Sequence, residues 1–148
     1  MKSGTREGAV GGQLMYLIDT DILIYSLKGH EQVIDHLQRT ATASKAMSVI
    51  SYGELLFGAQ KSGRPDENLA RVRRLGEVLP VIEVSPAIME AFGSLKARLE
   101  REGRRLDDFD LVIAATAMTV GYRLITNNEK HFARIEGLHI GNWAKTGF

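Results

Sequence analysis

The sequence predicts an α/β fold, in which a mainly parallel sheet of four to five strands is enclosed by helices. Short apolar runs alternate along the chain with segments of helix length, and parallel strands need connections of that length. Several apolar runs end directly in polar residues, as buried strands do where they reach a functional edge. With 148 residues the chain is long enough for one hydrophobic core and too short for two, so we expect a single domain.

Five short apolar runs are the candidate strands. The first, LMYLI at residues 14–18, stops at the polar residues 19–21. The others are expected at residues 47–50, 81–84 and 122–125, with a last one near residues 138–141. Sites in open parallel sheets form beyond the carboxyl ends of the strands. We therefore expect Asp19, the turn at Ser51 and Thr126 to lie at one edge.

Helices are predicted between these strands from periodicity and capping residues. They are expected at residues 22–27, 31–39, 51–61, 69–79, 86–102 and 111–120. Ser85 is a typical N-cap and Pro86 suits the first helical position, while Gly103 and Gly121 are typical helix ends. The segment 111–120 is apolar nearly all round and rich in alanine, so we expect it to be a central, buried helix.

The first thirteen residues, MKSGTREGAVGGQ, hold four glycines and show almost no apolar periodicity. They cannot bury enough surface to offset the entropy of ordering. The sequence therefore predicts a flexible tail at residues 1–13 before a domain at residues 14–148.

The composition excludes several classes of protein. Hydrophobic residues make up 44% and charged residues 25%, which is typical of a folded globular chain. The 19 Lys and Arg residues against 18 Asp and Glu give a net charge of +1, so any affinity for nucleic acid must be local. The absence of cysteine excludes disulfides and thiolate zinc sites. No stretch approaches the ~20 apolar residues of a membrane span, and we expect a cytoplasmic protein.

Polar or acidic residues recur at four predicted boundaries between a strand and a helix. The groups are Asp19-Thr20-Asp21, Ser51 with Glu54, Asp107-Asp108 with Asp110, and Thr126-Asn127-Asn128-Glu129. Each group has a structural explanation, since acids favour the first turn of a helix and Ser51 with Glu54 fits a capping box. Asp108 fits a plain N-cap in the same way.

The conjunction of three acids from distant segments, Asp19, Glu54 and Asp110, favours a metal site instead. Carboxylates brought together repel one another, and hard divalent cations such as Mg²⁺ or Mn²⁺ relieve that repulsion through oxygen ligands. Soft-metal sites are disfavoured, because cysteine is absent and the four histidines show no paired spacing. A cation held in this way can activate water and stabilise a phosphodiester under attack.

The motifs that carry these residues resemble those of PIN domains. The matching strings are YLIDTDILIYSLKG, MSVISYGELLFGAQKSG, DDFDLVIAATAMTVGYRLITNN and HFARIEGLHIGNW, which together cover residues 14–143 in order. In detail they are similar to the VapC-type toxins of bacterial VapBC toxin–antitoxin pairs. The resemblance implies a PIN-like three-layer α/β/α sandwich in which Asp19, Glu54 and Asp110 are the metal-binding catalytic acids.

The same resemblance implies partners and an activity. It implies Mg²⁺- or Mn²⁺-dependent endonucleolytic cleavage of RNA, often a tRNA or a ribosomal RNA loop. It also implies a homodimer and a small VapB-type antitoxin whose C-terminal segment occupies a groove of the toxin. Arg104 and Arg105, a few residues before Asp110, are the candidates for contacts to RNA phosphates.

The chain departs from the family pattern at two positions. Asp21 stands where many relatives have Asn, and His131 stands where relatives usually place a fourth acid. One metal site is therefore expected to be complete and a second is in doubt. The candidates for a second metal or for support of the first are Asp21, Asp108, Thr126, Asn128 and Glu129.

Two other functions fit parts of the pattern. Asp19-Thr20-Asp21 after an apolar strand also matches the opening motif of haloacid-dehalogenase-like phosphatases, with Asp19 as nucleophile. Against this, Asp107 and Asp108 precede a helix rather than follow a strand. In the second alternative, His131 marks a loss of chemistry and the fold serves as a non-catalytic module that binds RNA or a partner.

Overall fold

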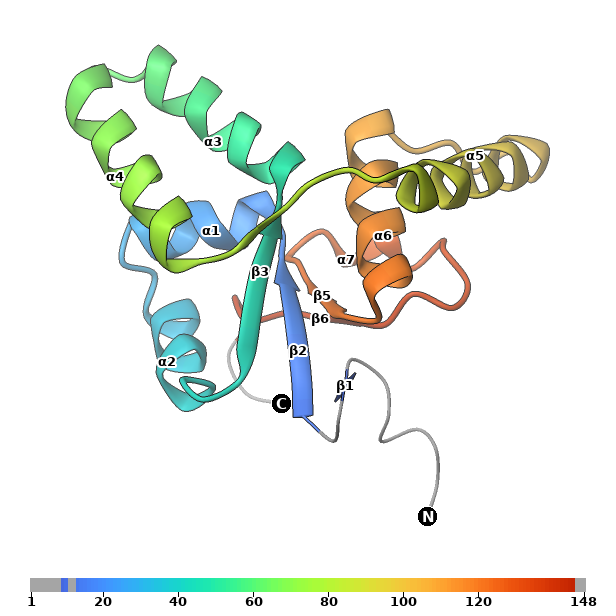
Figure 1. Ribbon diagram of the computed structural model, residues 1–148, viewed down its shortest axis with the longest axis horizontal. Helices are drawn as coiled ribbons and strands as arrows, with labels where there is room; N and C mark the ends of the chain where they lie inside the picture. The colour runs from blue at the N-terminus through green and yellow to red at the C-terminus, as the bar shows by residue number, and fades with distance from the viewer. Residues whose placement is uncertain (1–8, 11–12, 146–148) are drawn as a thin grey trace.

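The computed structural model describes residues 9–10 and 13–145, and it has the α/β architecture that the sequence predicts (Figure 1). The strands are β1 (Ala9–Val10), β2 (Gln13–Ile18), β3 (Ser44–Ser48), β4 (Val81–Ile82), β5 (Arg123–Ile125) and β6 (Ile140–Gly141). The helices are α1 (Thr20–Leu27), α2 (Glu31–Arg39), α3 (Val49–Lys61), α4 (Pro65–Val78), α5 (Pro86–Arg101), α6 (Asp108–Val120) and α7 (Glu129–Phe132).

The sheet has β2 at its centre. Its order is β4-β3-β2-β5-β6, and all of these neighbours run parallel. The register aligns Leu17 of β2 with Ala46 of β3 on one side and with Leu124 of β5 on the other. Parallel pairing brings the carboxyl ends of the three strands to the same edge, and the segments that follow them meet there.

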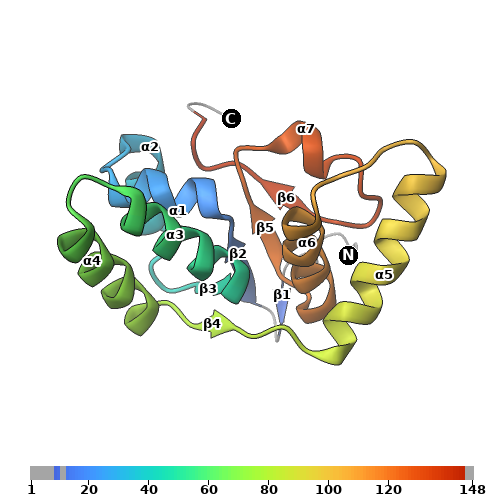
Figure 2. The ribbon, with the colours of Figure 1, turned by 90° about the horizontal axis from the view of Figure 1, so that it is seen from above.

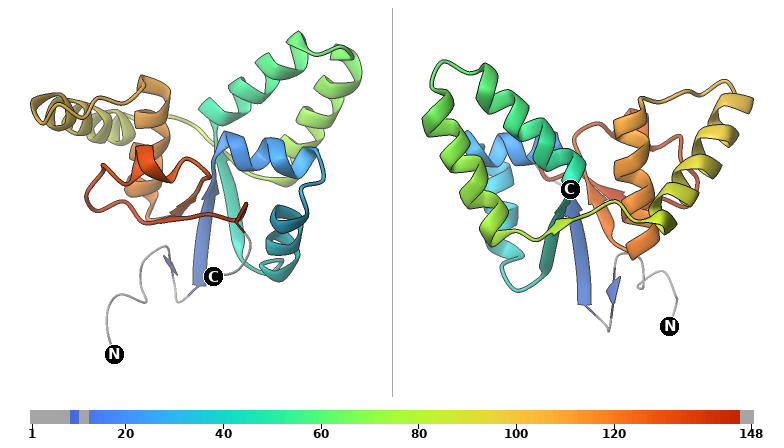
Figure 3. Two further views of the ribbon diagram at one scale, coloured as in Figure 1. Left: turned by 180° about the vertical axis from the view of Figure 1, so that it is seen from behind. Right: turned by 45° about the horizontal axis from the view of Figure 1, so that its top comes forward.

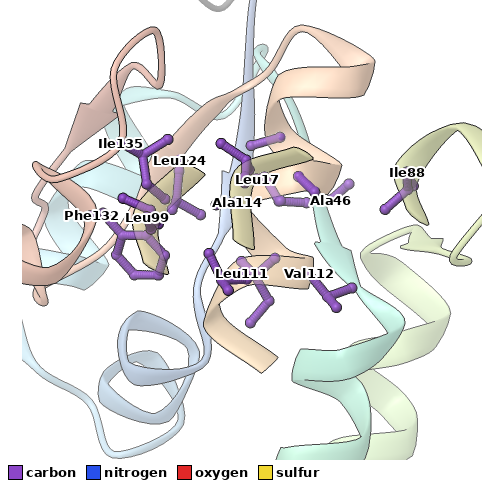
Figure 4. Packing of buried hydrophobic residues seen from close by; sticks show 14 residues of the cluster. Leu17, Ala46, Ile88, Leu99, Leu111, Val112, Ala114, Leu124, Phe132 and Ile135 are labelled. Carbon is purple, nitrogen blue, oxygen red and sulfur yellow. The ribbon is translucent and has the colours of Figure 1, made fainter. Parts of the chain in front are cut away.

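Helices cover both faces of the sheet, as a three-layer sandwich requires (Figures 2 and 3). Alternate residues of β2 divide between two cores, with Leu17 packed toward α5 and α6, and Tyr16 and Ile18 packed toward α1 to α4. Figure 4 shows that Leu17, Ala46 and Leu124 belong to the same core as the buried side chains of α6. This alternation follows from the two-residue period of a strand. It explains why the predicted strands read as continuous apolar runs rather than alternating ones.

The central helix is α6, and it is more deeply buried than its neighbours. Its residues from Leu111 to Ala117 are all buried, as the alanine-rich and apolar sequence predicts. Gly121 caps it in the left-handed conformation, with a φ of 76°. No helix within residues 13–145 is long and apolar enough to cross a lipid bilayer.

The structure corrects the predicted start of the third helix. The sequence predicts a strand at residues 47–50 and a helix from Ser51, but β3 ends at Ser48 and α3 begins at Val49. Ser48 is the N-cap, and its hydroxyl accepts a hydrogen bond from the amide of Ile50 at 3.0 Å. The hydroxyl of Ser48, three residues before Ser51, thus caps the helix, and the alternative interpretation of Ser51 with Glu54 as a capping box is wrong.

Other differences are smaller. Asp107, rather than Asp108, is the N-cap of α6, and the short helix α7 was not predicted. Within the predicted tail, Ala9 and Val10 pair antiparallel with the start of β2. The rest of that prediction, at residues 1–8 and 11–12, lies outside the described residues.

The left-handed conformation of Gly121 gives a test of the fold. A Cβ there meets no atom within 4 Å, so Gly121→Ala acts through backbone strain alone. We expect it to lower the free energy of unfolding by about 1 kcal/mol. Gly93→Ala, at an unhindered position inside α5, should raise it by about 0.5 to 1 kcal/mol. Urea denaturation measures both, and equal effects of the two variants would contradict the prediction.

Candidate active site

Residues from all four predicted polar or acidic groups meet at the carboxyl edge of the sheet. Asp19 directly follows β2, Thr126 directly follows β5, and Asp110 lies in the first turn of α6. Glu54 lies in the second turn of α3, which follows β3. In Figure 1, α1 and α3 begin at this edge because they follow β2 and β3, whereas α6 begins near it and leads back to the start of β5.

Asp19 is the most buried of the acids, with 6% of its surface exposed. Its Oδ1 accepts a hydrogen bond from the amide of Thr20 at 2.8 Å, and its Oδ2 accepts one from the buried hydroxyl of Thr126 at 2.7 Å. Burial, together with the nearby carboxylates of Asp21 and Asp110, raises the pKa of Asp19 from 3.8 to about 7, although the two hydrogen bonds act to lower it. The site therefore holds a carboxylate in a place that disfavours its charge.

Asp21 is half-buried and contacts the segment that follows β5. Its Oδ2 accepts a hydrogen bond from the amide of Asn127 at 3.1 Å, and its Oδ1 accepts one from the amide of Ile22 at 2.7 Å. Burial raises its pKa as well. Asp21 therefore does not point into open solvent: it connects the start of α1 to the segment after β5 and adds to the repulsion on Asp19.

Glu54 is connected to the site through a hydroxyl that the sequence did not single out. The Thr20 hydroxyl donates to Glu54 Oε1 at 2.6 Å, and the Thr20 and buried Ser51 hydroxyl oxygens lie 2.9 Å apart. Since each hydroxyl has one proton, Thr20 donates to the carboxylate and accepts from Ser51. Glu54 therefore does not cap α3, and its carboxylate is directed toward α1. Its position between two acids at the end of a strand is the sequence feature that could have indicated Thr20 as a site residue.

Asp110 shares the site with His131. Burial raises the pKa of Asp110, and Asp107 and Glu54 raise it further. His131 Nδ1 lies 3.9 Å from Asp110 Oδ2 and 2.9 Å from Asn128 Nδ2. The side-chain amide of Asn128 donates to that nitrogen, which orients the imidazole beside the acid. The backbone amide of Asn128 also donates to the Thr126 hydroxyl at 2.9 Å, so these residues form one network with Asp19.

Two further predicted acids have partners elsewhere. Asp108 is exposed and forms an ion pair with Lys96 of α5 at 2.9 Å. Glu129 accepts from Asn142 and from Lys145, each at 2.7 Å, and these contacts lower its pKa. Glu129 therefore does not replace the fourth acid in this conformation.

The two arginines predicted to contact RNA phosphates have different surroundings. Arg105 Nε lies 4.0 Å from Glu100 Oε2, whereas Arg104 lines a polar cleft beside the C-terminal end of α5.

The donors at this edge fit a hard divalent cation in their chemistry. Asp19, Asp21, Glu54 and Asp110 offer only oxygen. Burial raises the pKa of Asp19, Asp21 and Asp110, and neighbouring carboxylates raise it further in Asp19 and Asp110. Within the described part of the chain, however, no three Asp, Glu, His or Cys side chains are close enough together to hold an ion as they stand. Direct binding of one ion by three of these acids would therefore need at least one carboxylate to move, and Glu54 is held at this edge by the Thr20 hydroxyl.

A mostly apolar groove runs from this site between α1, α3 and α4. Its volume is about 370 Å³, and Glu54 lines it together with Ile24, Leu55 and Val72. Ile24 is 37% exposed, and Phe57 of α3 is 63% exposed. An apolar surface of this kind beside a polar site is typical of a binding surface.

The chain is similar to known proteins over nearly its whole length. The PIN-domain family matches residues 16–138. Ribonuclease VapC2 of Haemophilus influenzae is 32% identical over 131 residues, covering 88% of this chain and 98% of the relative. The tRNA(fMet)-specific endonuclease VapC of Shigella flexneri is 30% identical over 131 residues, covering 88% of this chain and 99% of the relative.

Solved structures agree with these sequence matches. The structure of VapBC2 from Rickettsia felis, bound to a DNA fragment from its promoter, superposes with a TM-score of 0.82 at 30% identity, covering 88% of this chain and 99% of that one. DNA-bound VapBC from Salmonella typhimurium gives the same values. The chain therefore belongs to the PIN-domain family and, within it, to the VapC ribonucleases.

Proposed function

We propose that this VapC ribonuclease is the toxin of a VapBC pair and cleaves RNA, a tRNA or a ribosomal RNA, with the help of Mg²⁺ or Mn²⁺. The observation that carries the metal dependence is Asp19, a carboxylate buried to 6% exposure beside two further acids, with a pKa of about 7. A divalent cation is the ligand that such a site favours most.

Asp19, Glu54 and Asp110 would hold the ion. When bound, it would supply an activated water and a positive charge beside the phosphodiester. Other residues of the chain position these acids. Thr126 and the amide of Thr20 fix both oxygens of Asp19, and Thr20 holds Glu54 at the same edge. With His131 in place of the fourth acid and Glu129 bound to Lys145, the proposal includes one ion.

Of the two alternative functions, one is excluded and the other is open to a direct test. A haloacid-dehalogenase-like phosphatase is not compatible with membership of the PIN family, and the second aspartate of its motif, Asp21, is bound to two backbone amides. A non-catalytic binding module remains the alternative, and a direct test of cleavage distinguishes it from the proposal.

The partners belong to the same proposal. Structures similar to this one are VapBC assemblies, and we propose that a VapB-type antitoxin covers the apolar groove between α1, α3 and α4 with its C-terminal segment. Glu54 lines that groove, so an occupant would reach the active site. A homodimer, as the family resemblance implies, and a cytoplasmic location beside its RNA substrates complete the proposal.

Two aspartates in one turn of α6 provide a matched test of catalysis. Asp110→Asn removes a proposed metal ligand, whereas Asp108→Asn removes only an exposed ion pair with Lys96. We expect Asp110→Asn to lower the rate of RNA cleavage by about a thousandfold or more, and Asp108→Asn by less than about threefold. The measurement is cleavage of a tRNA(fMet) transcript in Mn²⁺ by gel electrophoresis. Cleavage by Asp110→Asn at the normal rate would contradict the proposal.

The raised pKa of Asp19 predicts how stability depends on pH. Because the folded pKa, about 7, lies above the ordinary value of 3.8, the folded state binds the extra proton, and stability is lost as pH rises from about 4 to 7. Asp19→Asn abolishes that loss. Without metal it should be more stable than the wild type at pH 8, by up to about 4 kcal/mol, and equally stable below pH 4. Urea denaturation at both pH values measures this, and a less stable variant at pH 8 would refute it.

A further inference from the structure

A second polar site lies away from the acids, where α5 ends. Three arginines and two glutamates line a cleft of about 390 Å³: Arg98, Glu102, Arg104, Arg134 and Glu136. Arg98 and Glu102 belong to the end of α5, Arg104 to the segment that leads to α6, and Arg134 and Glu136 to the segment after α7. Figure 2 shows these two segments beside each other. A hydrogen bond from Arg134 Nη1 to the carbonyl of Arg105, at 3.0 Å, joins them.

The three arginines of this cleft are not held in ion pairs within the described chain. Arg39, Arg64 and Arg105, in contrast, each form one. The Nη2 atom of Arg98 is buried and has no hydrogen-bond partner among the described residues. Buried polar groups are almost always hydrogen-bonded, so a guanidinium in this state indicates a ligand with acceptor oxygens.

The cleft lies on two segments that also carry residues of the active site. Arg104 lies six residues before Asp110 on the segment that begins α6, and Arg134 lies three residues after His131, which faces Asp110. Arginine guanidinium groups bind phosphates through paired N–H donors. The two glutamates limit the net charge of the lining to +1, so the cleft is not a general trap for polyanions.

We propose that Arg98, Arg104 and Arg134 form an exosite for a backbone phosphate of the RNA, at a distance from the phosphodiester that is cleaved. This inference rests on the proposed function, since it assigns part of the substrate of the same enzyme. Backbone contacts of this kind position a nucleic acid without reading its sequence. The exosite therefore contributes to affinity and to the register of the RNA, and the acids at the sheet edge carry out the chemistry.

The test measures RNA affinity in the full chain with Asp110→Asn added, so that the RNA stays intact. A labelled tRNA(fMet) transcript is the probe, and binding is followed by fluorescence anisotropy between about 50 and 200 mM salt. Arg98→Gln and Arg104→Gln should each weaken binding about fivefold, and each should make the dependence of log Kd on log salt less steep by about 0.7 to 1. Arg101→Gln is the matched control, because Arg101 is an exposed arginine of α5 outside the cleft. It should change affinity by less than about twofold.

Two further measurements keep the outcomes distinct. The melting temperature of Arg98→Gln without RNA should be no lower than that of the parent, because the substitution removes a guanidinium nitrogen that is buried without a hydrogen-bond partner. Arg104 is exposed, so its variant tests the exosite even if Arg98→Gln fails to fold. If both variants bind RNA as Arg101→Gln does, the exosite is refuted while cleavage by the wild type still upholds the proposed function. Loss of antitoxin binding without loss of RNA binding would also refute it, by assigning the cleft to a protein partner.

Discussion

The hydrogen bond between Thr126 and Asp19 is the interaction on which the rest of the site depends. It joins the ends of two neighbouring parallel strands, at 2.7 Å, where the amide of Asp19 also donates to the carbonyl of Ile125 at 2.8 Å. The Thr126 hydroxyl in turn accepts from the amide of Asn128, which positions the segment that carries His131. One buried hydroxyl thus determines where Asp19 lies and where α7 begins.

That arrangement costs stability, and the cost fits the metal-dependent activity that we propose. A carboxylate at 6% exposure, with Asp21 and Asp110 nearby, is held where its charge is disfavoured. A folded protein could avoid this cost with an amide or an apolar residue, which supports the proposal that Asp19 binds a cation. In the described part of the chain the carboxylates stand apart, and the Thr20 hydroxyl binds Glu54; under our proposal, a bound ion would draw them together.

Much of the fold could be predicted because buried parallel strands and capped helices leave strong local signals. The apolar run ending at Asp19, the proline after Ser85 and the glycine at 121 each marked an element correctly. The start of α3 could not be predicted, because Ser48 and Ser51 are both good N-caps and only the register of β3 selects between them.

The acids that we propose for the site were predicted from their place at expected boundaries between strands and helices, whereas their partners could not be predicted. Thr20, Asn142 and Lys145 act through contacts between distant segments, and these depend on packing that no local pattern records. The same holds for the cleft at the end of α5. Its arginines were visible as charges in the sequence, but only the fold shows that Arg98 has an unpaired buried nitrogen and that Arg134 lies beside the α5–α6 connection.

The most direct test of the central claim is the titration of Asp19 itself, followed by carboxyl ¹³C NMR in the protein without and with Mg²⁺. The structure predicts a pKa of about 7 without the ion, and a pKa at or below the ordinary value of 3.8 when Mg²⁺ is bound, because the cation stabilises the charged form. A pKa near 3.8 in the free protein, unchanged by Mg²⁺, would contradict the claim that Asp19 is a buried acid held for a metal.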